Sequence, residues 1–128
     1  MKHINKLIKK SPKIGLISLG CPKALVDSEK ILTSLIHNGY LINKDHRNAD
    51  LVIVNTCGFI DSAKEESINT ISSSLNENGK VIITGCLGKD KKTIKKFEDK
   101  VLSISGPSEM CKVLRTVQKV FLQQKKTN

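Results

Sequence analysis

Three cysteines, Cys21, Cys57 and Cys86, stand at equivalent points of the sequence, each at the end of an apolar, strand-like run. The three runs cover residues 14–19, 51–55 and 81–84. If they are neighbouring parallel strands, their carboxyl ends share one edge of the sheet, so thiols about 30 residues apart in sequence meet in space. Thiolates favour zinc, copper(I) or iron–sulfur clusters, and three of them leave one ligand position open. The pattern predicts a metal site.

Residues beside these cysteines are candidates for supporting roles. Gly20, Gly58 and Gly85 flank them, and glycine lets the backbone approach closely and aim N–H groups at sulfur. Asn55 and Thr56 directly precede Cys57, so we expect them to hydrogen-bond its loop or a substrate group. Glycine at a strand end is also ordinary turn chemistry, and that alternative stays open.

The cysteine spacing alone does not identify the metal. No Cys-x-x-Cys pair occurs, which is the usual sign of a zinc site, and one cysteine at a strand end is most simply a small core residue. Three in equivalent positions favour metal ligation. Cys111 falls in an amphipathic stretch far from any strand end, and we expect it to pack in the core.

Alternating strand and helix patterns run along the whole chain. We expect strands at 14–19, 40–43, 51–55, 81–84 and 101–105, and helices at 26–38, 61–75, 89–98 and from 110 onward. This order predicts an α/β fold: a doubly wound open parallel sheet of Rossmann or flavodoxin type, with about five strands and helices on both faces. We expect a basic disordered arm at 1–12, one domain at 13–122 and a tail at 123–128.

The chain of 128 residues carries a formal net charge of +10, with 22 basic residues. Arg47 and Arg115 are the arginines and aromatics make up 3%, whereas nucleic-acid recognition usually recruits arginine forks and stacking rings. Direct nucleic-acid binding is therefore not expected. No apolar run approaches the roughly 18 residues that span a bilayer, so we expect no membrane partner and a cytoplasmic protein, where disulfides are rare.

Three motifs resemble one known family. The sequences SLGCPKALVDSE at 18–29, NTCGFIDSAKEES at 55–67 and TGCLG at 84–88 are similar to the amino-terminal domain of radical-SAM methylthiotransferases, and the resemblance runs from about Lys13 to Phe121. The Cys-Pro-Lys and Cys-Gly-Phe-Ile forms look like the RimO branch, which modifies an aspartate of small-subunit ribosomal protein twelve. Ala24 departs from the asparagine that the family usually has.

The resemblance implies a cofactor and a substrate. It implies that Cys21, Cys57 and Cys86 hold an auxiliary [4Fe-4S] cluster whose open iron carries the sulfur delivered to the ribosomal protein. In the family, a second domain with Cys-x-x-x-Cys-x-x-Cys reduces S-adenosylmethionine and a carboxyl-terminal domain grips the substrate. We expect both to be absent from this chain, as a cloned fragment or a truncated product, with no catalytic residue for the radical step. The sequence identifies no sulfur donor.

Two alternatives remain open from the sequence. One is a stand-alone iron–sulfur or zinc binding module that carries sulfur or metal. The other is a metal-free α/β interaction domain that binds ribosomal components through its lysines.

Overall fold

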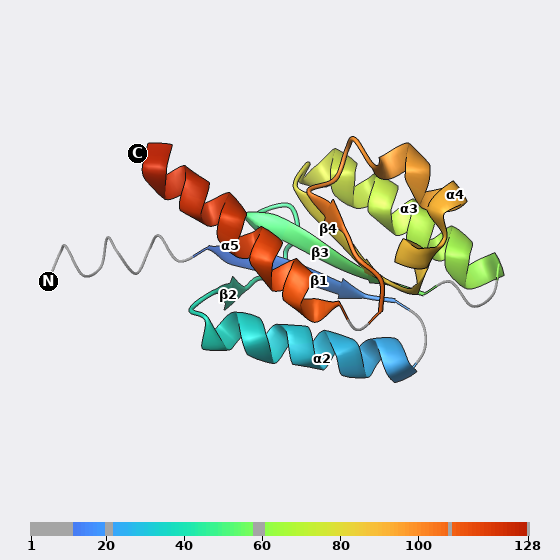
Figure 1. The fold of residues 1–128 in the computed structure, drawn as a ribbon, viewed down its shortest axis with the longest axis horizontal. Helices are drawn as coiled ribbons and strands as arrows, with labels where there is room; N and C mark the ends of the chain where they lie inside the picture. The colour runs from blue at the N-terminus through green and yellow to red at the C-terminus, as the bar shows by residue number, and fades with distance from the viewer. Residues whose placement is uncertain (1–11, 20–21, 58–60, 108, 128) are drawn as a thin grey trace, which may run out of the picture.

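The computed structural model describes residues 12–19, 22–57, 61–107 and 109–127 (Figure 1). The strands are β1 (Lys13–Ser18), β2 (Leu41–Ile42), β3 (Leu51–Thr56), β4 (Val81–Gly85) and β5 (Ser103–Ile104). The helices are α2 (Pro22–His37), α3 (Asp61–Glu77), α4 (Lys91–Ile94) and α5 (Met110–Thr127), with 3-10 turns η1 (Cys86–Lys89) and η2 (Lys95–Phe97). Among the described residues, no helix has both the length and the apolar character needed to cross a bilayer.

The five strands form one parallel sheet in the order β2-β1-β3-β4-β5. The central strands read as continuous apolar runs because both of their faces are buried, as parallel sheets require. Chain progression reverses between β1 and β3, and ligands of doubly wound sheets bind at this reversal, outside the carboxyl ends of the strands. The predicted doubly wound α/β fold is confirmed.

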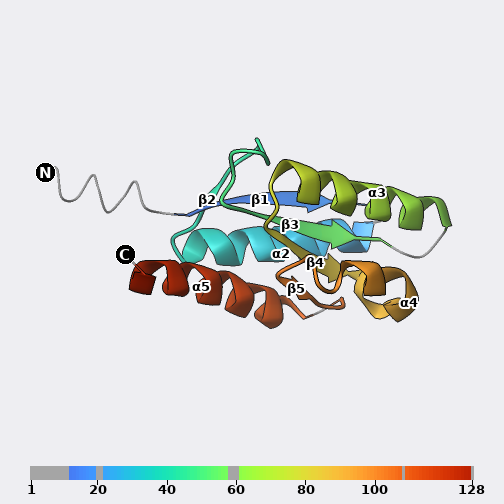
Figure 2. The same ribbon diagram turned by 90° about the horizontal axis from the view of Figure 1, so that it is seen from above.

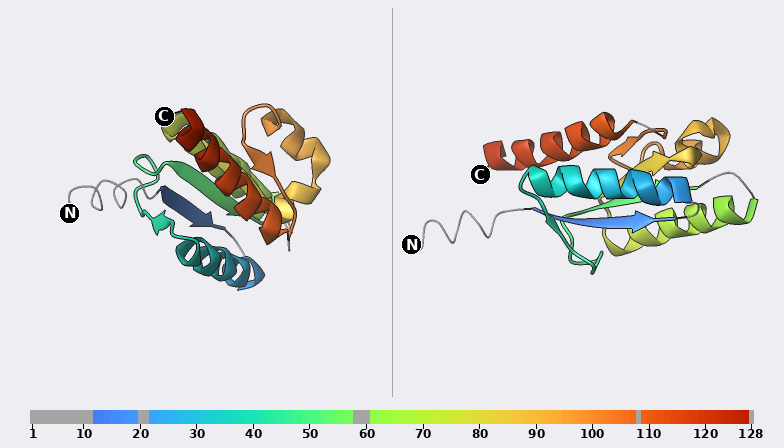
Figure 3. Two further views of the ribbon diagram at one scale, coloured as in Figure 1. Left: turned by 60° about the vertical axis from the view of Figure 1, so that its left-hand side comes forward. Right: turned by 90° about the horizontal axis from the view of Figure 1, so that it is seen from below.

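Helices cover both faces of the sheet, and each face has its own core (Figures 2 and 3). On one face α2 and α5 pack on β1, β3 and β4, with Leu35 and Val113 fully buried. On the other face α3 and the turns from η1 to η2 cover β3 and β4, with Ile71 and Phe97 buried. The last helix turns an apolar stripe toward the first of these cores, since Val113, Val117 and Phe121 are all buried.

Three elements differ most from their predicted bounds. The helix expected at 26–38 begins at Pro22, because proline at a first helical position has a suitable φ and loses no hydrogen bond. The helix expected at 89–98 is divided, because Asp90 caps a new helix by accepting the Thr93 N–H at 3.2 Å. The last strand is shorter than expected, covering only Ser103–Ile104.

Two expected segments remain, the amino-terminal arm and the carboxyl-terminal tail. The predicted arm at 1–12 lies outside them except for residue 12. The last helix extends to Thr127, so it continues past residue 122, where we expected the tail to begin.

Candidate functional site

The ends of β3 and β4 give Cys57 and Cys86 matching positions. Thr56 pairs with Gly85 in the parallel register, so the cysteine that follows each strand lies at the same level of the sheet. Neighbouring strands are about 4.8 Å apart, which brings the two backbones close. Cys57 is 4% exposed, and Cys86 is half-buried at the first residue of η1.

β1 leads the chain to the same edge. Its last residue, Ser18, pairs with Asn55, and the Leu19 N–H donates to the Asn55 carbonyl at 2.9 Å. Cys21, Gly20 and Gly58 lie outside the described residues. Within the described ranges no three His, Cys, Asp or Glu side chains are grouped to hold a metal ion, so the three-cysteine ligand set stays a prediction.

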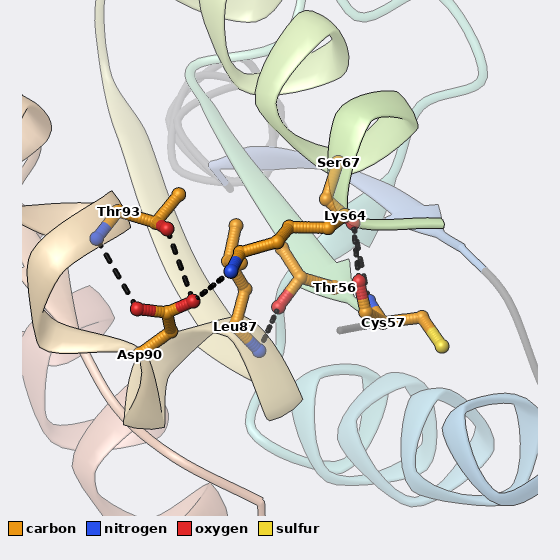
Figure 4. Close-up of polar contacts among 7 residues, drawn as sticks. All are labelled: Thr56, Cys57, Lys64, Ser67, Leu87, Asp90 and Thr93. Atoms are coloured by element: carbon orange, nitrogen blue, oxygen red, sulfur yellow. Dashed lines mark hydrogen bonds and ion pairs between the residues drawn. The ribbon is translucent and has the colours of Figure 1, made fainter. Parts of the chain in front are cut away.

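Ser67 fixes the backbone of Cys57 from the neighbouring helix α3. Its fully buried hydroxyl accepts the Cys57 N–H at 3.2 Å and donates to the Cys57 carbonyl at 2.9 Å. Figure 4 shows the Cys57 sulfur pointing away from these contacts. One hydroxyl thus satisfies both backbone hydrogen-bonding groups of Cys57, and the Cys57 thiol takes no part in these two hydrogen bonds.

Thr56 joins the end of β3 to the turn that carries Cys86. Its hydroxyl is fully buried, donates to the Thr84 carbonyl at 2.8 Å and accepts the Leu87 N–H at 3.0 Å (Figure 4). We expected this residue to bond the loop of Cys57 or a substrate group, whereas these two hydrogen bonds go to the end of β4 and to the turn after Cys86. The residues on both sides of Cys86 are therefore held from β3.

Gly85 cannot carry a side chain in this arrangement. Its φ is +95°, and a Cβ atom would lie 2.5 Å from Asn55 Oδ1 and 2.5 Å from the Thr56 carbonyl oxygen. The positive φ favours glycine because L-residues rarely adopt it. The short distances exclude a Cβ atom because it would overlap the neighbouring oxygens. Gly85 lets β4 turn sharply into Cys86 directly against β3.

Asn55 ties β3 to α2. Its side chain is 2% exposed, and its Nδ2 donates to the buried hydroxyl of Ser28 at 2.8 Å. This contact links the strand before Cys57 to the helix that follows residues 20–21. Asn55 therefore connects two of the three segments that bear the predicted ligands.

An ion pair lies near the same edge of the sheet. Lys64 on α3 forms an ion pair with Asp90, whose carboxylate also accepts the Thr93 N–H and hydroxyl (Figure 4). The hydrogen bond from Lys64, together with those from Thr93, lowers the pKa of Asp90 to about 2. The ion pair connects α3, which follows Cys57, to α4, which follows Cys86.

A cavity of about 170 Å³ lies beside the cysteine edge, between α2 and the start of α5. Asn55, Thr84 and Gly85 form its wall on the strand side, and Lys30 and Met110 line it from the helices. The cavity offers room for a small ligand next to the residues that precede Cys57 and Cys86.

Sequence reasoning missed Ser67 and Asp90. A serine at position 67 stands between Ala63 and Ile71 on the inward side of α3, and a polar residue in such a stripe signals a buried hydrogen bond. Asp90 with Thr93 three residues later is the ordinary pattern of a helix cap. The prediction that Cys111 packs in the core was wrong, because Cys111 is exposed on α5.

Comparisons with known proteins agree with the motifs. Residues 13–106 match the family model described as "Uncharacterized protein family UPF0004". The chain is 53% identical over 110 residues to "Ribosomal protein uS12 methylthiotransferase RimO" of Bordetella pertussis, covering 86% of this chain and 25% of that protein. It is 54% identical over 109 residues to the protein of the same name from Xanthobacter autotrophicus, covering 85% and 24%.

A third relative of that name, from Brucella anthropi, is 55% identical over 107 residues, covering 84% of this chain and 24% of the relative. The resemblance drawn from the three motifs is therefore confirmed. The chain spans about a quarter of the length of the curated relatives that it matches.

Proposed function

The chain belongs to the family described as UPF0004, and from this premise we propose that it is the auxiliary cluster-binding domain of a ribosomal-protein methylthiotransferase. In this proposal Cys21, Cys57 and Cys86 hold a [4Fe-4S] cluster with one open iron. The substrate is the ribosomal protein uS12, modified at an aspartate.

The register of β3 and β4 is the observation that carries the proposal. Thr56 and Gly85 are paired, so Cys57 and Cys86 leave neighbouring strands at one level, an arrangement that suits two ligands of a single cluster. The donor set fits the group: thiolates are the usual ligands of iron–sulfur clusters, and the low exposure of Cys57 keeps water from a cluster edge. The cluster would supply an iron able to bind a sulfur species.

The residues of this chain position the ligands. Ser67 holds the Cys57 peptide, Thr56 holds the Leu87 amide beside Cys86, and Gly85 brings β4 close to β3. Hydrogen bonds of this kind keep loops in one conformation, which reduces the ordering cost of binding a rigid group.

Within these 128 residues the sequence holds four cysteines. Three on one cluster leave only Cys111, so these residues supply no Cys-x-x-x-Cys-x-x-Cys set for a second cluster. The proposed role is therefore the sulfur-bearing half of the reaction. The step that generates a radical from S-adenosylmethionine needs a second cluster, which these residues do not hold.

Anaerobic reconstitution with iron and sulfide tests the proposal. We expect about four irons and four sulfides per chain and a broad absorption near roughly 400 nm. Cys21→Ala, Cys57→Ala and Cys86→Ala should each lower the iron content, whereas Cys111→Ala is the matched control and should keep it. A colourless chain that retains zinc, or a triple cysteine variant that binds iron as well as the wild type, would contradict the proposal.

A further inference from the structure

One face of β1 is only partly covered by a helix in the described part of the chain. The chain passes from β2 to β3 through residues 43–50 without forming a helix, and on this side α3 packs mainly over β3 and β4. Figure 2 shows α3 on the opposite side of the sheet from α5. His46 from this loop lies against Gly15, where a Cβ atom would approach its Cδ2 to 2.8 Å. The next residue on this face, Ile17, remains half-buried beside an open groove.

The groove runs along α3 and has a volume of about 470 Å³. Ile17 and His46 line the sheet side, and Asn69, Thr70 and Ser73 line the helix side with groups that can donate and accept hydrogen bonds. From Glu65 to Glu77 the helix rises by about 18 Å, which matches five or six residues of an extended polypeptide.

The charge of the groove is opposite to that of the chain. Glu65, Glu66 and Glu77 line it, and all three are exposed. Lys64 on the same helix is directed to Asp90 instead, and Arg47 forms an ion pair with Glu77 at 3.7 Å. A chain with a net charge of +10 thus presents an acidic wall along this groove.

We propose that this groove binds an extended, lysine- and arginine-rich segment of the protein substrate. The inference rests on the proposed function, because a ribosomal protein carries basic segments that neutralise RNA phosphates. The carboxylates of this wall outnumber the one cation paired with them, so the groove repels a phosphate backbone and favours a polypeptide over a nucleic acid. The Ile17 side chain offers an apolar floor, and the α3 hydroxyl and amide groups can bond a peptide backbone.

The Glu65 end of the groove is the end nearer to Cys57. Glu65 lies in the same stretch of α3 as Ser67, whose hydroxyl holds Cys57. A segment lying in the groove is therefore guided to the carboxyl edge of the sheet, beside the candidate cluster. The groove would act as a specificity element that orients the substrate without taking part in the chemistry.

Fluorescence anisotropy with peptides that cover the uS12 sequence tests the inference. We expect the full chain to bind a basic peptide at low salt, and affinity to fall as salt rises. Glu65→Gln/Glu66→Gln/Glu77→Gln should weaken binding by roughly tenfold to thirtyfold, since each exposed pair contributes modestly. Glu29→Gln/Glu98→Gln/Asp99→Asn, at exposed positions elsewhere, changes the net charge equally and should leave affinity within about twofold.

Equal weakening by both triple variants would overturn the inference, because the effect would then belong to net charge. Absence of peptide binding would overturn it too, as would binding that appears only after residues 1–11 are removed, because the basic amino terminus would then occupy the groove. Iron content measured on the same preparations separates the two proposals. A chain that keeps its iron but binds no peptide contradicts only the groove, and a chain that binds peptide but no iron contradicts only the cluster.

Discussion

The side chain of Ser67 makes both hydrogen bonds of the Cys57 backbone, at 3.2 Å to the N–H and 2.9 Å to the carbonyl oxygen. A single residue of α3 therefore fixes the conformation of a predicted cluster ligand ten positions earlier in the chain. Both residues lie in the motif at 55–67, but the hydrogen bonds between them are visible only in the structure, and their importance can be measured directly.

Ser67→Ala should destabilise the chain by about 1–3 kcal/mol, because it leaves two buried backbone groups of Cys57 without partners. Urea unfolding of the metal-free protein measures this cost. Ser72→Ala, at an exposed position of the same helix, is the control and should change stability by less than about 0.5 kcal/mol. Equal stability of the two variants would show that the Ser67 contacts carry no weight.

Gly85→Ala should be more damaging than Gly79→Ala, although both glycines have nearly the same φ, +95° and +91°. At Gly79 the nearest atom to a new Cβ is the Leu75 carbonyl oxygen at 4.0 Å, so that variant costs only backbone strain of about 1–2 kcal/mol. At Gly85 the contacts at 2.5 Å add steric overlap with backbone and with Asn55. Similar unfolding free energies for both variants would refute the close approach of β4 to β3.

Thr56→Val keeps the shape of the side chain but removes its hydroxyl. The Leu87 N–H then loses its acceptor at 3.0 Å and should exchange with solvent faster, with a loss of stability of about 1–3 kcal/mol. Amide exchange followed by NMR tests this at one residue. Thr33→Val, exposed on α2, should leave the Leu87 exchange rate unchanged.

Asp90 should contribute to stability in a defined range of pH. Its pKa is lowered from 3.8 to about 2 in the folded chain, chiefly by Lys64 and then by Thr93, so its contribution is complete above about pH 4 and is lost as pH falls to about 2. Asp90→Asn should therefore unfold at lower urea than the wild type at pH 6, and the gap should close between pH 4 and pH 2. In a Lys64→Met background the gap should be smaller throughout. A gap that stays constant with pH would contradict the ion pair.

The sequence could predict the core strands and where the cysteines stand relative to them. Residues 51–54 and 81–83 are apolar without alternation because both faces of a central parallel strand are buried, and such a run ends where the sheet ends. Cys57 and Cys86 follow those ends directly, so their position at one edge was predictable once the strands were assumed to be neighbours.

Contacts between distant elements were not predictable in the same way. The bond from Asn55 to Ser28 joins residues 27 positions apart, and it depends on how α2 packs against β3 rather than on local pattern. The helix expected at 89–98 is divided because Asp90 caps a new helix, α4, and such a cap competes with continuation of the preceding turn. The first contact is decided by packing, which no local pattern contains, whereas the spacing of Asp90 and Thr93 is a local signal of the cap.

The parallel pairing of β3 with β4 also sets the order of events in biosynthesis. Parallel neighbours need a crossover of a dozen or more residues, here filled by α3, so the edge that carries Cys57 and Cys86 arises only after the whole crossover has been made and docked. No short peptide from this chain reproduces that edge. Any group that bridges Cys57 and Cys86 must be acquired after translation of β4, by a chain that has already begun to fold.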